Sequence, residues 1–311
     1  MQQKTIYAIL ADEGKLVSFL QMHGVLGKPP ACPNCNKPCK LYTDKYRYRC
    51  TNLLTLGGAN KVKKQKRVCS FEVGAKKGTF FEKANLPLET ICEFVFVWLA
   101  HKPKQEWMES EFGMSSKTVV DWANFCREVC LVSLIDTSEK IGGPGKIVEI
   151  DECKMGKRKY NRGRIIDGQW IFGGIERRTK RLFYVPVAER TKDHLLAVIK
   201  EWILPGTTIM SDCWKAYDCL AHEGFQHLRV NHSQNFVDPE SGAHTQNIER
   251  VWRDLRAGVP KYGRREEHFA GYLAEHVYRK KYFDHKNMFH AFFKSMAHVY
   301  PPSIDRDEHA N

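Results

Sequence analysis

The chain has 311 residues, of which 42% are hydrophobic, enough for one large domain or two to three small ones with a real core. It carries 49 Lys and Arg against 36 Asp and Glu, and the resulting formal net charge of +13 favours a polyanionic partner. No apolar run of about 18 residues occurs and the N-terminus lacks a cleavage site, so neither a membrane span nor secretion is expected. With 11 Cys and no secretory signal, metal binding is a better expectation than disulfides.

Five segments are expected along the chain. They are a helical arm, a cysteine-bearing zinc-ribbon-like segment, a helical helix-turn-helix region, a catalytic domain and a tail, at residues 1–30, 31–83, 84–140, 141–295 and 296–311. The apolar positions of the arm are Leu16, Phe19, Leu20 and Met22. Gly142 to Gly145 contain three glycines and a proline, which is a linker signal before the fourth segment.

The cysteine-bearing segment predicts a structural zinc site. Cys32 and Cys35 form a C-x2-C knuckle, a spacing at which two thiolates bind one tetrahedral Zn²⁺ from a tight turn. Cys50 and Cys69 are the proposed second pair, although the long gap between them is irregular for a knuckle. Cys39 is the competing ligand, and four unrelated thiols are the alternative interpretation.

Two features near the N-terminus suggest contact with DNA. Residues 61–67 hold five basic residues, of which Lys63 and Lys64 are expected to touch phosphate unless the loop is merely solvated. Residues 105–112, 113–115 and 116–130 have the form helix, glycine-containing turn, helix, capped by Ser115 or Ser116. Lys117 at the start of the second helix is then a DNA contact, and an ordinary helical hairpin is the alternative.

After the glycine linker, strands and helices alternate. Strands are expected at 146–151, 169–176, 181–188, 207–212 and 225–232, and helices at 192–204, 214–224 and 244–259. This order, three strands and then helix-connected strands, is that of an RNase H-like domain of the α+β or α/β class.

Three carboxylates stand at strand ends or a helix start in this order. Asp151 ends the first strand, Asp212 ends the fourth, and Glu249 lies at the edge of the apolar stripe of the last helix. Converging carboxylates are tolerable with Mg²⁺ or Mn²⁺ between them, and two such ions catalyse phosphodiester chemistry. Each acid also has a structural interpretation. Glu149 shares the strand face of Asp151, so either residue could point inward, and Glu152 could lie on the surface. Asp212 could cap the following helix, and Glu249 could pair with Arg253.

Polar residues flank Glu249. His232, His244 and Asn247 are expected to support the metal pocket, or alternatively to cap the helix. Arg253 and Arg256 on the same helix are expected to contact DNA.

The segments EIDE (149–152), SDCWKAY (211–217) and HTQNIERVWR (244–253) resemble the transposases of the Merlin superfamily and, more distantly, bacterial insertion-sequence transposases. The resemblance covers about residues 145–290. It implies an RNase H-like DDE domain that binds transposon inverted-repeat ends and target DNA, and that cleaves and transfers strands with divalent metal. The family's acids then fall on Asp151, Asp212 and Glu249. The segment around Cys32 is similar to the family's zinc ribbon, from which the gap before Cys69 departs.

Other functions remain as alternatives. A domesticated, non-catalytic DNA-binding protein would keep the N-terminal segments, and an RNase H-like nuclease acting on RNA would not need them. No small-molecule substrate is expected, because neither usual glycine-rich phosphate loop occurs. Holding two ends together implies at least a homodimer. A nuclear location is favoured for a eukaryotic host, and a cytoplasmic one otherwise.

Overall fold

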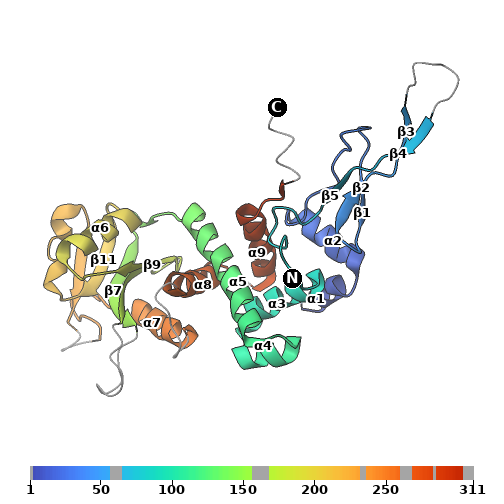
Figure 1. Ribbon diagram of the computed structural model, residues 1–311. Helices are drawn as coiled ribbons and strands as arrows, with labels where there is room; N and C mark the ends of the chain where they lie inside the picture. Colours follow the sequence, from blue (N-terminus) through green and yellow to red (C-terminus); the bar gives the residue numbers. More distant parts are fainter. Residues whose placement is uncertain are drawn as a thin grey trace. The chain divides into compact units, whose positions relative to one another are not determined.

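The computed structural model describes residues 3–56, 65–155, 168–231, 236–259, 268–282 and 285–303 (Figure 1). The chain forms two compact units. The first contains Met1–Ser133 together with Tyr282–Asn311, and the second contains Leu134–Lys281. None of the helices in the described ranges is long and apolar enough to cross a membrane.

The N-terminal arm is a pair of short helices, α1 (Gln3–Leu10) and α2 (Glu13–Met22). The Asp12 side chain accepts the Lys15 N–H at 2.9 Å and so starts α2. Leu16, Phe19 and Leu20 are buried as the sequence pattern predicts, whereas Met22 is 69% exposed.

The cysteine-bearing segment folds as small antiparallel sheets. β1 (Lys40–Tyr42), β2 (Arg47–Arg49) and β5 (Glu72–Gly74) form one three-stranded sheet. β3 (Leu53–Leu56) and β4 (Gln65–Val68) pair separately. The long gap between Cys50 and Cys69 is therefore occupied by a hairpin of its own.

The helical region consists of α3 (Leu88–His101), α4 (Gln105–Phe112) and α5 (Ser116–Thr137). Gly113, at φ 60°, ends α4 in the left-handed conformation that glycine tolerates best. The Ser115 hydroxyl accepts the Thr118 N–H at 3.2 Å and caps α5.

The last helix, α9 (His285–Val299), belongs to the first unit although it comes last in sequence. Its Phe289 stacks on Phe19 with ring centroids 5.5 Å apart and meets the edge of Phe96 at 5.8 Å. Residues 285–295, expected within the catalytic domain, therefore pack with the N-terminal helices.

The second unit is built on one five-stranded sheet in the order β12-β11-β7-β8-β9. β7 (Ile147–Met155), β8 (Gln169–Glu176) and β9 (Leu182–Val187) form an antiparallel meander. β11 (Thr208–Asp212) runs parallel to β7, and β12 (Gln226–Val230) runs parallel to β11. The mixed α/β class expected from the sequence is thus confirmed.

Helices cover both faces of this sheet (Figure 1). On one face, α6 (Lys192–Trp202) buries Leu195 and Ile199 against Val148 and Ile150 of β7. On the other, α7 (Gln246–Gly258) and α8 (Phe269–Lys281) pack on Cys153, Met155 and their neighbours. The two faces follow from strand alternation, because successive side chains of β7 point to opposite sides.

Two local expectations differ from the structure. The single helix predicted at 214–224 is instead two short 3₁₀ helices, η2 (Lys215–Tyr217) and η3 (Leu220–Glu223). Each of the two short helices buries one large side chain, Tyr217 in η2 and Leu220 in η3. The parallel pair β6 (Ile141–Gly142) and β10 (Ile203–Leu204) was not predicted.

Candidate functional site

Asp151 and Asp212 lie on neighbouring strands at the centre of the sheet. β11 pairs with β7 in parallel, with Met210 opposite Glu149. Asp151 and Asp212 each lie two residues beyond this last paired position, and the charge of Asp212 acts on Asp151. Both carboxylates are half-buried. The sheet therefore brings together two acids that are separated by 60 residues of sequence.

Helix α7 places the third acid near this pair. The Trp252 indole N–H donates to Asp151 Oδ2 at 2.9 Å, which ties the second turn of α7 to β7. Glu249 lies one turn earlier on the same helix and is exposed, and it accepts a hydrogen bond from the Thr245 hydroxyl at 3.0 Å. Asp212 also accepts the Trp214 N–H at 3.1 Å.

The three carboxylates affect one another electrostatically. Burial raises the pKa of Asp151 to about 6, the Trp252 hydrogen bond opposes this shift, and the charges of Asp212 and Glu249 add to it. A cation between these acids would relieve the repulsion, and their oxygen ligands suit Mg²⁺ or Mn²⁺. The arrangement could therefore hold a hard divalent cation beside Asp151, which lies in the middle of β7 rather than at the strand's end as predicted, because β7 continues to Met155.

Glu149, two residues before Asp151 on the same strand face, is fully buried and fastens α7 to the sheet. Its carboxylate accepts the backbone N–H groups of Asn247 and Ile248 at 2.9 and 3.1 Å. Arg177 Nε donates to it at 2.7 Å. Since Thr245 makes no side-chain cap, Glu149 caps the first turn of α7, which carries Glu249. From the sequence Glu149 was only a competitor of Asp151, and the strand face that the two residues share was the signal of its position.

Two of the three residues expected to support the metal pocket, Asn247 and His244, lie beside Glu149. The Asn247 side-chain amide donates to Glu149 at 2.7 Å, and Lys180 donates to the Asn247 amide oxygen at 3.0 Å. His244 Nδ1 is 3.6 Å from the Glu149 carboxylate. His232 lies outside the described residues. A supporting role for all three stays a prediction.

Glu152 extends to the opposite face of the sheet and is buried rather than on the surface, with its side chain 6% exposed. Burial, with the charges of Asp151 and Asp212, raises its pKa to about 8, and Arg190 opposes this shift. Its Oε1 atom has no hydrogen-bond partner among the described residues.

The expected DNA contacts are dispersed over the chain. Lys117 is exposed on the first turn of α5, and Arg253 and Arg256 are exposed on α7. Arg256 also donates to Cys153 Sγ at 2.9 Å. Lys63 and Lys64 lie outside the described residues.

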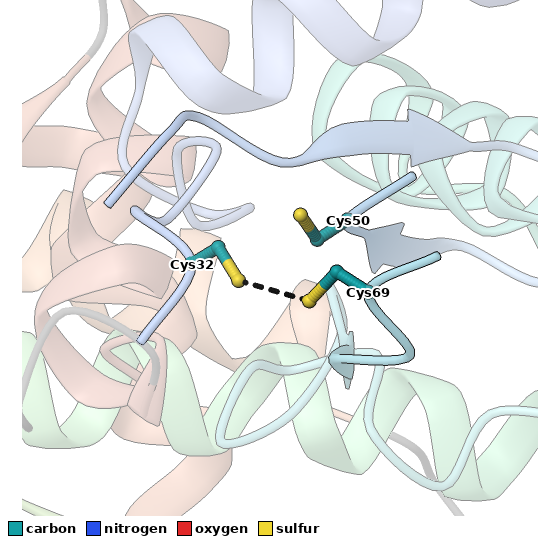
Figure 2. A group of neighbouring side chains, drawn as sticks. All are labelled: Cys32, Cys50 and Cys69. Atoms are coloured by element: carbon teal, nitrogen blue, oxygen red, sulfur yellow. Dashed lines mark hydrogen bonds between the residues drawn. The ribbon is translucent and has the colours of Figure 1, made fainter. Parts of the chain in front are cut away.

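The proposed zinc ligands meet in the first unit, as Figure 2 shows for Cys32, Cys50 and Cys69. Cys32 Sγ lies 3.4 Å from Cys69 Sγ, and Cys35 Sγ lies 3.4 Å from Cys50 Sγ. Among the described residues, only Cys32, Cys50 and Cys69 form a group whose possible ligand atoms all lie within 4.8 Å of one another. The three acids of the second unit converge less tightly than these sulfurs.

The surroundings of the sulfurs fit a metal-thiolate centre. In a tetrahedral zinc site the Zn–S bonds of about 2.3 Å place sulfurs roughly 3.8 Å apart, close to the separations found here. The Asn34 amide donates to Cys69 Sγ at 3.4 Å, and the Asn52 amide donates to Cys50 Sγ at 3.3 Å. The Cys69 N–H donates to the Asn52 carbonyl at 2.8 Å, which joins the two ends of the β3–β4 hairpin. Cys39 is buried in the same segment.

Comparison with known proteins finds a family model that matches the second unit. Residues 141–281 match the ISXO2-like transposase domain. An uncharacterized transposase-like protein of Haemophilus influenzae is 30% identical over 100 residues, which span 32% of this chain and 80% of that protein. Among solved structures, the catalytic core domain of BIV integrase has a TM-score of 0.28 and 15% identity, over 42% of this chain and 80% of that one. The matched domain contains the five-stranded sheet and all three candidate acids.

Proposed function

Because this chain belongs to a transposase family, with an ISXO2-like transposase domain at residues 141–281, we propose that it is a DNA transposase that cleaves and transfers strands at transposon inverted-repeat ends. The observation that carries the proposal is the convergence of Asp151, Asp212 and Glu249 from β7, β11 and α7. The resemblance to Merlin transposases assigns the family's acids to these same three residues.

In this proposal the three acids hold Mg²⁺ or Mn²⁺. Two such cations, when bound, activate a water or a 3′-hydroxyl and stabilise the leaving oxygen of a phosphodiester. Trp252 keeps the Asp151 carboxylate oriented through its indole N–H. Glu149 keeps the first turn of α7, and with it Glu249, close to β7. His232, His244 and Asn247 would then support the pocket around these groups.

The first unit would bind the DNA ends. α4 and α5 have the form of a helix-turn-helix, with Lys117 exposed where the second helix begins. The cysteine cluster would hold a structural Zn²⁺ through Cys32, Cys35, Cys50 and Cys69. Lys63, Lys64, Arg253 and Arg256 are further proposed phosphate contacts.

Strand cleavage by the full chain tests the proposal. The substrate is a duplex carrying the sequence that flanks its own gene, with and without MgCl₂. Asp151→Asn, Asp212→Asn and Glu249→Gln are each expected to reduce cleavage at least about a hundredfold, because several kcal/mol of transition-state stabilisation is lost with a metal ligand. Asp193→Asn, at an exposed acid of α6, is the matched control.

The same assay distinguishes a catalytic transposase from a domesticated, non-catalytic DNA-binding protein. A domesticated DNA-binding protein would bind the duplex but leave it intact in the wild type as well as in the variants. Membership of the Merlin superfamily and assembly into a homodimer on paired ends stay predictions. The bacterial relative gives no support to a nuclear location, which is not part of the proposal.

A further inference from the structure

An arginine and two tryptophans lie at the end of the central strands, on the sheet face opposite α7. Trp170, on β8, and Trp214, just after β11, both pack against the core beneath α6. Arg190 follows the end of β9, and its guanidinium lies 3.8 Å from the centroid of the Trp170 ring and 5.3 Å from that of Trp214. The Lys154 ammonium lies 5.6 Å from the centroid of the Trp170 ring.

Arg190 is held in place, and none of the described residues accepts a hydrogen bond from its guanidinium. Stacking on two rings fixes the plane of the guanidinium, which carries five N–H donors in a fork. Across the described residues, the only acid paired with Arg190 is Glu152, at 3.8 Å, which is too long for a hydrogen bond. The side chain is 41% exposed, so a ligand can reach it.

This fork lies beside the proposed catalytic acids. The Trp214 N–H donates to Asp212 Oδ1 at 3.1 Å, and Glu152 directly follows Asp151 in β7. A DNA strand that crosses the acids needs cationic groups, because its phosphates and the carboxylates repel one another. A planar guanidinium with free donors matches the geometry of a phosphate better than an ammonium does.

We propose that Arg190, held between Trp170 and Trp214, binds a backbone phosphate of the DNA strand that lies across the acids. This inference rests on the proposed function and adds a DNA contact on the face opposite α7. The Trp rings fix the guanidinium, and Lys154 adds a second positive charge to the same surface.

The test measures DNA binding by the full chain without added Mg²⁺, so that no cleavage is required. The affinity for a fluorescent duplex oligonucleotide is measured by anisotropy over a series of KCl concentrations. Arg190→Gln is expected to weaken binding and to reduce the slope of log K against log salt by about 0.9, the effect of one lost phosphate contact. Arg181→Gln is the matched control, because Arg181 is in the same unit, is 40% exposed and pairs with Glu139 instead.

A second variant distinguishes the contribution of the guanidinium geometry from that of the positive charge. Arg190→Lys keeps the positive charge, so the slope should stay near that of the wild type while the affinity falls. Thermal melting of each variant checks that it is folded. Equal slopes and affinities for Arg190→Gln and Arg181→Gln would overturn the inference, as would wild-type affinity for Arg190→Lys. Failure of the wild type to bind the duplex at any salt concentration would instead overturn the proposed function.

Discussion

At the proposed site, the half-buried Asp151 carboxylate lowers the stability of the metal-free protein. Its pKa in the folded chain is about 6, against an ordinary value of 3.8. A raised carboxyl pKa means that the folded state binds the proton more tightly than the unfolded state does. Without metal, stability therefore falls as the pH rises from about 4 to about 6 and stays low above that range.

Asp151→Asn is thus expected to raise the melting temperature of the metal-free protein at neutral pH. The amide removes the buried charge and its repulsion by Asp212 and Glu249, and its oxygen can still accept the Trp252 N–H. The gain should shrink as the pH falls through about 6 and be small below about 4. Calorimetric melts of both proteins at several pH values measure this. A gain that does not change with pH would contradict the account.

Glu149 is expected to be structurally costly to remove. Glu149→Ala leaves Arg177 and the two amides of α7 without their buried acceptor, which should cost about 3–5 kcal/mol in the free energy of unfolding. Glu139, at 78% exposure and paired with Arg181, is the control, and its alanine variant should stay within about 0.5 kcal/mol of the wild type. Denaturant unfolding of the second unit measures both, and similar losses would show that Glu149 does not fasten α7.

Among the elements, α5 is the helix that we expect to contact the DNA end. Lys117→Glu is expected to weaken binding to the end duplex and to reduce the salt slope by about 1, since one phosphate contact is lost. Lys15→Glu, on α2 with a side chain 64% exposed, makes the same change of charge elsewhere in the first unit. Equal effects of the two substitutions would mean that only net charge matters.

Sequence patterns predicted elements best where many residues repeat one signal. β8 occupies residues 169–176 as predicted, because aromatic and β-branched residues mark it on both sides of Gly173 and Gly174. β6 and β10 have two residues each, too few for any periodicity, and they were missed. The separate 3₁₀ helices η2 and η3 were merged into one helix, since Tyr217 and Leu220 are also compatible with helical spacing.

The site was predictable only in part for a similar reason. Strand ends indicated Asp151 and Asp212, and the amphipathic stripe of α7 indicated Glu249. The contact between Glu149 and α7 joins residues 98 positions apart, and no local pattern contains it. Arg190 was missed because its two aromatic partners come from separate strands.

At the scale of the whole molecule, removal of zinc should unfold part of the first unit and leave the sheet of the second unit folded. The purified chain is expected to carry about one Zn²⁺, and chelation should expose the amides of β1, β2 and β5 while those of β7 and β8 stay protected. Metal analysis and hydrogen exchange of the full chain measure this. Absence of zinc from protein prepared without chelator would contradict it. Loss of zinc in Cys39→Ser but not in Cys69→Ser would make Cys39 the fourth ligand.

Binding of Mn²⁺ to the full chain, followed by electron paramagnetic resonance, measures whether Asp151, Asp212 and Glu249 hold divalent cations together. We expect Mn²⁺ sites in the wild type and in the exposed control Asp193→Asn, and weaker binding in each of Asp151→Asn, Asp212→Asn and Glu249→Gln. The Mn²⁺ affinity of the wild type should also fall as the pH drops below about 6, where Asp151 binds a proton. Wild-type Mn²⁺ affinity in all three variants would contradict it.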